Sequence, residues 1–269
     1  MKKLIGTLIL GSLFCLGLFA LSYAKPDQSA PPVSIGVADR PASPVSIGDV
    51  LRAHNVPQNP DALSAFVAEA VRLTSRPAGI DRESPSFFER QVSVVMADDR
   101  YKRYTADPLK QREQVVLFDG SAFHYAVSER GKLAEEANQM TDSQARGVEL
   151  NVKTFNLVPI LKQLSDPATE VIYLGRTVGS QDKFDVKTAT NRWTLYADTE
   201  HLICRIDVRD RVVEYASYRS VDGVRLPFVQ RLSIGGQLVQ EMVFTRIALN
   251  PDLPADCFSG AALSKQLVH

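Results

Sequence analysis

The residues best suited to chemistry in this chain are its histidines and one serine–lysine pair. None of the histidines has a partner at the spacing that places two zinc ligands on a helix, and no H-E-x-x-H occurs; they are His54, His124, His201 and His269. Ser180 and Lys183 have the S-x-x-K spacing of some hydrolases, but they fall in a polar turn between predicted strands, where a nucleophile would be poorly held. These patterns indicate no catalytic centre.

Cys204 and Cys257 are the two cysteines outside the apolar N-terminal segment. An even number of cysteines in an exported protein suggests a disulfide. Cys204 alternates with the apolar Leu202 and Ile206, however, so it lies on an apolar strand face where a buried thiol fits equally well. Because a disulfide also needs a short distance between the two residues, both interpretations stay open.

Most aromatic residues of the chain lie on predicted strands. For any single ring the ordinary role is core packing. As a group, these rings and their aliphatic neighbours are the side chains that would line an apolar, lipid-accepting cavity. The candidate lining residues are Trp193, Leu195, Tyr218, Leu226, Phe228 and Phe244.

Three helices are predicted among the elements that position these side chains. Residues 60–74 carry one apolar stripe at helical spacing, and Asn59 is a suitable N-cap. Thr141 and Gln144 have the spacing of a capping box. Residues 157–164 form a further amphipathic segment.

The remaining elements are strands, which follow one another with short, turn-rich connections from residue 170 to residue 249. This order predicts antiparallel neighbours in a meander. Asp119-Gly120-Ser121 and Asp222-Gly223 mark two hairpins, and the second needs positive φ at both central positions. The fold class is therefore α+β and mainly antiparallel β, with one sheet that curls toward a half-open β-barrel covered by a few amphipathic helices.

Several strands are apolar on both faces, as residues 237–249 show most clearly. A sheet that meets water on one side would carry polar residues there, so both faces need cover. Incomplete or movable cover would leave a cavity for a hydrophobic ligand. Complete cover would give a plain two-layer core, which is the alternative.

The N-terminus has the pattern of a secretory leader. Lys2 and Lys3 precede an almost wholly apolar run, and Ser22-Tyr23-Ala24 supplies the small residues of a cleavage site. We expect a signal peptide over residues 1–24, cleaved after Ala24, and export to the periplasm. The alternative is an uncleaved leader that anchors the protein to the inner membrane.

Two further segments follow the leader. Residues 25–48 are rich in proline, contain PVSIG twice and are predicted to be a flexible tether; residues 49–269 are predicted to be a single domain. The chain has 31 basic and 31 acidic residues, so removal of Lys2 and Lys3 leaves a net charge of about −2. A basic excess is therefore missing, and a nucleic-acid partner is not expected.

Three stretches of the second half form an ordered set. They are RWTLYADTEHLICRIDV (residues 192–208), VEYASYRSVDGVRLPF (residues 213–228) and FTRIALNPDLPADCF (residues 244–258). The set has a Trp-containing strand, a Tyr-x-x-Tyr strand, an Asp-Gly hairpin with Leu-Pro, and a closing Ile-x-Leu-Asn followed by Phe. Together these stretches resemble the LolA/LolB-like superfamily, the periplasmic carriers and acceptors of outer-membrane lipoproteins. The resemblance covers about residues 155–258.

This resemblance implies a half-open antiparallel β-barrel covered by helices, with an apolar cavity that takes acyl chains. It implies no catalysis and no cofactor. The expected protein is a non-enzymatic periplasmic binding protein for acyl chains, lipoproteins or another hydrophobic ligand, with a role in outer-membrane lipoprotein or lipid trafficking. The alternative is a periplasmic sensor or interaction protein that uses the same fold to bind a membrane-anchored protein partner, because fold does not determine function.

Overall fold

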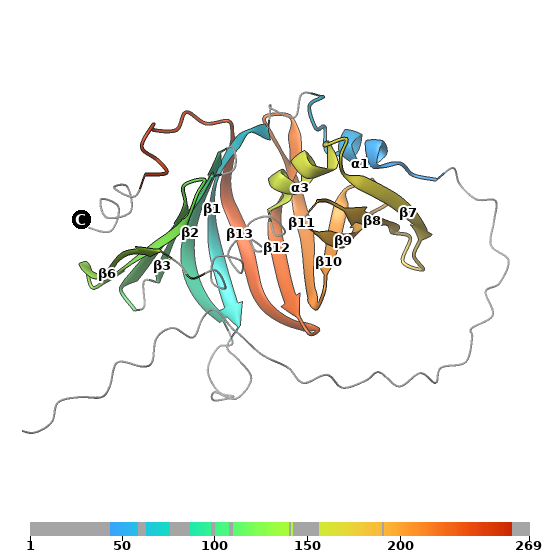
Figure 1. The fold of residues 1–269 in the computed structure, drawn as a ribbon. Coiled ribbons are helices and arrows are strands. Elements are labelled where there is room, and N and C mark those ends of the chain that lie inside the picture. Colours follow the sequence, from blue (N-terminus) through green and yellow to red (C-terminus); the bar gives the residue numbers. More distant parts are fainter. Residues whose placement is uncertain are drawn as a thin grey trace, which may run out of the picture. The chain divides into compact units, whose positions relative to one another are not determined.

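Thirteen antiparallel strands form one sheet in the computed structural model of the chain (Figure 1). The structure describes residues 44–58, 63–75, 87–97, 100–107, 110–139, 141, 156–189 and 191–259. The strands are β1 (Ala65–Ser75), β2 (Phe87–Ala97), β3 (Arg100–Asp107), β4 (Arg112–Phe118), β5 (Phe123–Glu129), β6 (Lys132–Gln139), β7 (Glu170–Arg176), β8 (Asp182–Lys187), β9 (Arg192–Ala197), β10 (Ile203–Val208), β11 (Arg211–Val221), β12 (Val224–Ile234) and β13 (Gln237–Leu249).

The sheet consists of two meanders joined in the middle. Its order is β6-β5-β4-β3-β2-β1-β13-β12-β11-β10-β9-β8-β7, so the first and last strands of the series, β1 and β13, pair with each other. The edge strands β6 and β7 are not paired with each other within this sheet, which is therefore open. The predicted fold class, mainly antiparallel with a sheet that does not close, is confirmed.

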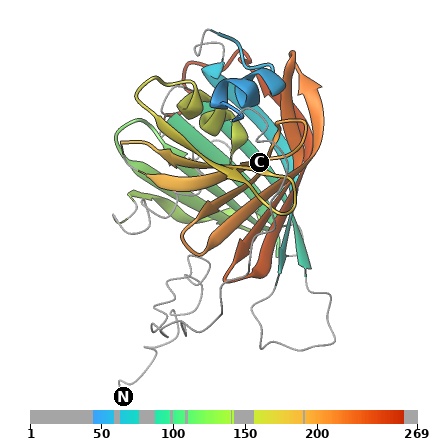
Figure 2. The same ribbon diagram turned by 90° about the vertical axis from the view of Figure 1, so that its right-hand side faces the viewer.

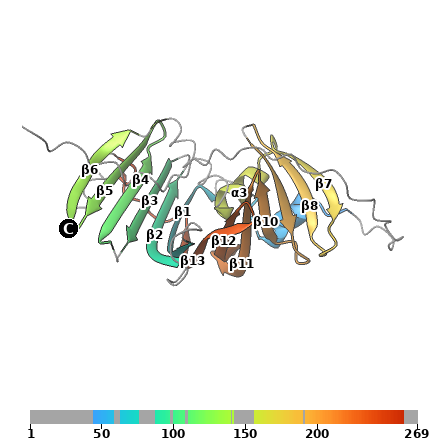
Figure 3. The same cartoon turned by 90° about the horizontal axis from the view of Figure 1, so that it is seen from below.

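Two helices are described, α1 (Ile47–Ala53) and α3 (Leu157–Leu164), and both lie on the same face of the sheet (Figure 2). Figure 3 shows α3 on the inner side of the curve that β10 to β13 form, while β2 to β6 extend to the other side. The predicted helix over residues 157–164 is confirmed, because its buried side chains repeat at helical spacing. The expected capping box at Thr141 and Gln144 is not tested, because Gln144 lies outside the described residues.

The helix predicted over residues 60–74 is wrong, because β1 occupies residues 65–75. This stretch is apolar on both faces, so it satisfies a helical stripe as well as a strand. In the structure Phe66, Ala68 and Ala70 alternate toward the core, and β1 pairs along its length with β2 on one side and β13 on the other. Pairing on both sides with two long strands outweighs the weak local helix preference of this stretch.

The second copy of PVSIG, residues 44–48, belongs to the folded unit that begins at Pro44. Ser46 is the N-cap of α1 and forms a capping box with Asp49. Val45 and Ile47 pack against the core. The segment that the sequence placed at the end of the tether is therefore the start of the helical cover.

The buried side chains form two clusters. The larger one lies on the inner face and joins α1 and α3 to strands of both meanders. The smaller one lies on the outer face of the β2–β6 meander and consists of Ala97, Val115, Leu117, Ala126 and Phe258. Phe258 comes from the segment that follows β13, so the C-terminal part of the chain covers this outer face.

The Asp222-Gly223 hairpin has the predicted geometry. Asp222 has φ 49° and Gly223 has φ 86°, so both central residues have positive φ. The hairpin fixes the register of β11 against β12, with Val221 opposite Val224 and Tyr218 opposite Pro227. This prediction is confirmed.

Candidate functional site

A small apolar pocket lies between the first turn of α3 and the middle of the sheet. Its volume is about 20 Å³, which is in the range that accommodates a single water molecule. Strands β1, β12 and β13 and the start of α3 supply its walls, which are Phe66, Ala68, Asn156, Leu157, Val158, Leu226, Pro227, Gln230, Phe244 and Ile247. Eight of these ten side chains are apolar, as is usual for a ligand site.

The pocket exists because a small residue, Ala68, lies at the junction of β1 and β13. Ala68 pairs with Ile247 across this junction, and Ala70 pairs with Phe244. The small side chain of Ala68 leaves room beside the ring of Phe244, and Leu157 and Val158 at the start of α3 close the space from above. The α3 helix itself is held by five buried aliphatic side chains, Leu157, Val158, Ile160, Leu161 and Leu164.

Two of the six candidate lining residues, Leu226 and Phe244, line this pocket. The others lie in the same inner cluster without reaching it: Trp193, Leu195 and Phe228 are buried, and Tyr218 is partly buried. The hydroxyl group of Tyr218 donates a hydrogen bond to the carbonyl oxygen of Ile203. Sequence reasoning missed the β1 side of the pocket because that strand was taken for a helix.

His54 joins α1 to two strands next to the pocket cluster. Its Nδ1 atom lies 2.8 Å from the carbonyl oxygen of Arg225, and its Nε2 atom accepts a 3.0 Å hydrogen bond from the backbone N–H of Ile203. These partners fix the neutral ring with its proton on Nδ1. Burial lowers the pKa of His54 to about 4, because the charged ring would lose its hydration.

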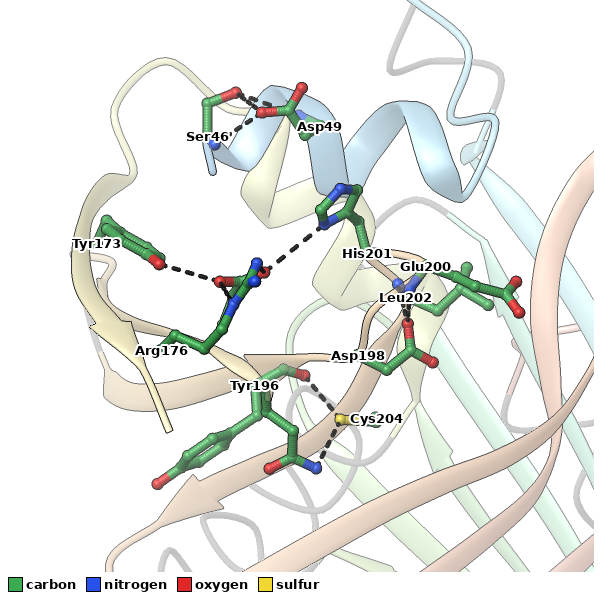
Figure 4. Close-up of polar contacts among 12 residues, drawn as sticks. Ser46, Asp49, Tyr173, Arg176, Tyr196, Asp198, Glu200, His201, Leu202 and Cys204 are labelled. Carbon is green, nitrogen blue, oxygen red and sulfur yellow. Dashed lines mark hydrogen bonds and ion pairs between the residues drawn. The ribbon is translucent and has the colours of Figure 1, made fainter. Parts of the chain in front are cut away.

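A second group of polar residues surrounds the buried Asp182 at the start of β8. Figure 4 shows three of its members, Tyr173, Arg176 and His201. Arg176 donates to both carboxylate oxygens, at 3.0 and 3.1 Å, and the hydroxyl of Tyr173 donates at 3.0 Å. Nδ1 of His201 lies 3.7 Å from the carboxylate, which is too long for a hydrogen bond. This arrangement ties the β7–β8 hairpin together through an ion pair whose carboxylate is buried and whose guanidinium is exposed to solvent.

The thiol of Cys204 lies near this group and is held in its protonated form. Burial raises its pKa to about 11, and Sγ donates to the carbonyl oxygen of Tyr196. Ser180 is exposed at the β7–β8 turn, where its backbone N–H donates to the carbonyl oxygen of Thr177, which is not a general base. Within the described part of the chain, no three His, Cys, Asp or Glu side chains are grouped so that they could hold a metal ion.

Cys204 and Cys257 are both free thiols in the structure. Cys204 lies on β10, whose buried neighbours Ile203 and Ile206 belong to the inner cluster. Cys257 packs against the outer cluster beside Phe258. The two cysteines therefore lie on different parts of the fold, Cys204 in the β7–β12 meander and Cys257 against the outer cluster of the β2–β6 meander.

Comparison with known proteins gives matches at the level of structure. No protein-family model matches the sequence, and no curated protein matches it. A DUF1329 family protein from Desulfovibrio piger matches with a TM-score of 0.53 and 12% identity, over 81% of this chain and 97% of that one. A LolA superfamily protein from Nitrosomonas europaea matches with a TM-score of 0.52 and 11% identity, over 80% of this chain and 98% of that one. The fold is LolA-like.

These identities are low, so the matches establish the fold alone. They agree with the resemblance in the second half of the sequence, where the Trp193 strand, the Asp222-Gly223 hairpin and the closing Phe258 are now seen as parts of a single sheet and its cover. Among the described residues, neither helix has the length and apolar character that crossing a membrane requires.

Proposed function

We propose that this protein is a non-enzymatic periplasmic binding protein for acyl chains, lipoproteins or another hydrophobic ligand. Its role would lie in outer-membrane lipoprotein or lipid trafficking. The observation that carries this proposal is the apolar pocket beneath α3 in a LolA-like sheet. Acyl chains are costly to expose to water, so a protein that takes them across an aqueous compartment must enclose them.

The pocket is much smaller than an acyl chain, so uptake requires α3 to move away from the sheet. The five buried aliphatic side chains of α3 contribute about 8–15 kcal/mol of burial in total. A chain of about fourteen methylenes buried in their place would contribute about 11 kcal/mol. Since the two quantities are similar, a ligand can replace the helix contacts without becoming impossible to release, and α3 can act as a movable cover.

The test is to purify the protein from periplasm and to extract its ligands. We expect native mass spectrometry to show an acyl-containing adduct, and organic extraction to release it. The purified protein should also bind the apolar dye N-phenylnaphthylamine in a way that long-chain lipids reverse. Absence of both an acyl adduct and displaceable dye binding would contradict the proposal.

We also propose the leader and tether that the sequence predicts. Cleavage after Ala24 would make Lys25 the first residue of the mature protein. The tether would then run over residues 25–43, since the folded unit begins at Pro44. N-terminal sequencing of protein purified from periplasm checks the cleavage site, and retention of the protein in the inner membrane with residues 1–24 intact would favour the anchored alternative.

A second candidate function is a sensor or interaction protein that binds a membrane-anchored protein partner. It is favoured by the exposure of Ile172 and Leu174 on the edge strand β7, and of Val178 in the turn that follows. Exposed aliphatic residues gathered on one hairpin are typical of contact surfaces. Cross-linking that captures one protein through this hairpin, from cells in which no lipid co-purifies, would favour this candidate over the carrier.

A further inference from the structure

Gln230 is a polar side chain in the otherwise apolar wall of the pocket. It lies on β12, opposite Tyr215 of β11 and Met242 of β13, and is only 7% exposed. Its side chain forms part of the pocket wall, and no hydrogen bond among the described residues involves its carboxamide. The carboxamide atoms are not among the fully buried side-chain atoms that lack a partner. The neighbouring wall residues from the same strand, Leu226 and Pro227, are apolar.

Because Gln230 is only 7% exposed, its carboxamide has little room for hydrogen bonds to water. A methionine or leucine would fill nearly the same volume without needing such bonds. The carboxamide offers two N–H donors and a carbonyl acceptor. In ligand sites, the few polar groups among apolar walls are the ones that orient the ligand and select it. Gln230 therefore indicates that the ligand itself carries a polar group at this depth.

The composition of the wall also restricts the charge of that group. None of the described residues that line the pocket is charged. A carboxylate or phosphate placed here would lose its hydration without gaining a counter-charge, which is strongly unfavourable. Asn156, the N-cap residue of α3, places a second neutral carboxamide in the same wall. An uncharged wall with the carboxamide of Gln230 as donor suits a neutral carbonyl group.

We propose that Gln230 recognises the neutral ester or amide carbonyl that joins an acyl chain to the rest of the ligand, and that the pocket thereby selects esterified or amidated chains over free fatty acids. This inference rests on the proposed function, because it assumes that acyl chains enter beneath α3. It assigns to Gln230 a role in specificity, while the apolar wall supplies most of the affinity.

The test compares four probes with the same twelve-carbon chain: methyl laurate, lauramide, laurate and dodecane. Each is titrated at pH 8 against N-phenylnaphthylamine bound to the full mature protein. We expect the ester or the amide to bind about three- to tenfold more tightly than dodecane, the gain of one hydrogen bond. Laurate, charged at this pH, should bind more weakly than methyl laurate. The ester and amide arms show which linkage the site prefers.

The variant Gln230→Met removes the carboxamide and keeps the volume. We expect it to abolish the preference for ester or amide over dodecane, while dodecane itself binds as well as before or better. The matched control is Gln237→Met, the same change at an exposed position at the start of β13, which should leave the preference intact.

Other outcomes overturn the inference in distinguishable ways. Equal affinities of the unmodified protein for dodecane, methyl laurate and lauramide would show that no carbonyl is recognised, even if Gln230→Met fails to fold. A preference that persists in a folded Gln230→Met protein would exclude Gln230 as its source. Tight binding of laurate would contradict the selection of neutral groups. If neither the dye nor any probe binds, the proposed function fails, and this inference fails with it.

Discussion

The two meanders on either side of the β1–β13 pair are covered in different ways. In the β7–β12 meander, buried residues alternate with exposed or partly exposed ones, as in β8 and β9, where Phe184, Val186, Trp193 and Leu195 face inward. The intervening residues meet water and carry ion pairs such as Arg192 with Asp185. This alternation is the pattern of a sheet with one buried face.

In the β2–β6 meander, consecutive residues of β4 are buried. Val115, Val116 and Leu117 on β4 are each at most 1% exposed. Val116 belongs to the inner cluster, while Val115 and Leu117 belong to the outer cluster under Phe258. A strand buried on both faces is held from two sides. We infer that this meander is the rigid part of the molecule, and that the meander covered by α1 and α3 is the part that can open.

The largest expected effect on stability comes from replacing Phe258, whose ring covers the outer cluster. Its ring is 5% exposed and lies 4.8 Å from the guanidinium carbon of Arg100. Replacing a buried Phe with Ala leaves a cavity, so Phe258→Ala should lower the free energy of unfolding by about 3–5 kcal/mol. Urea denaturation measures this loss, and Phe258→Leu should recover most of it.

The Phe258→Ala variant also tests whether the outer cluster of the β2–β6 meander affects ligand binding on the inner face. At a temperature where Phe258→Ala is still folded, its affinity for N-phenylnaphthylamine should equal that of the unmodified protein. A loss of less than about 1 kcal/mol would mean that the C-terminal segment is not a working cover. A large loss of dye affinity in the folded variant would mean that the two faces are coupled.

The second largest effect concerns His54, the buried side chain that joins α1 to β10 and β12. The folded protein holds the pKa of His54 at about 4, below the value of about 6.5 expected in the unfolded chain. The folded state therefore binds fewer protons than the unfolded state. As a result, the stabilisation that His54 gives the folded protein is complete above about pH 6.5 and is lost as the pH falls toward 4. The loss should be about 3 kcal/mol over this range.

Unfolding free energies at pH 7 and pH 4.5 check this expectation. His54→Asn keeps a donor near the carbonyl of Arg225 but does not titrate, so its acid-dependent loss should be smaller than that of the unmodified protein. His124→Asn is the matched control, because His124 is a partly exposed histidine on β5. Hydrogen exchange should show α1 opening before β4 as the pH falls, and simultaneous opening would contradict the proposed difference in rigidity.

The third effect is on the pocket. Ala68→Leu adds three carbons to a space of about 20 Å³, so dye affinity should fall about tenfold or more. Overpacking should also cost about 1–3 kcal/mol of stability. Ala70→Leu is the matched control: Ala70 lies on the same face of β1 and is 5% exposed, but it does not line the pocket. Equal losses of affinity in both variants would place the ligand elsewhere.

The sequence predicted the elements whose local pattern has one solution. The α3 stripe over residues 157–164 is a helix and nothing else, and Asp222-Gly223 permits few turns other than the one observed. Residues 65–75 have two solutions, since their apolar residues suit a helix or a strand buried on both faces. Only the strands on both sides, β2 and β13, decide between them.

The site was less predictable than the fold, because its residues meet only in three dimensions. Leu226 and Phe244 were expected from their places on apolar strands, and both reach the pocket. Ala68 and Gln230 were not expected to line the pocket, because a small residue or a single amide in a strand does not by itself indicate a binding site. Their roles depend on what lies opposite them, Ile247 for Ala68 and Tyr215 for Gln230.

The smallest expected effects come from one turn glycine in each meander, Gly223 between β11 and β12 and Gly120 between β4 and β5. Both have positive φ, 86° and 103°, and an added Cβ would meet no atom closer than 3.8 Å at either position. Replacement by alanine therefore adds backbone strain without a steric clash, and each variant should lose about 1 kcal/mol of stability in urea denaturation.

Because this strain is local, the two variants separate turn geometry from cover. If the β2–β6 meander is rigid only because it is covered on both faces, Gly120→Ala and Gly223→Ala should destabilise the protein to a similar extent, and both should keep dye affinity. If Gly120→Ala costs several times more than Gly223→Ala, the rigidity of that meander also depends on the register set by its turn. The difference between the two meanders would then lie in their hairpins as well as in the layers packed against them.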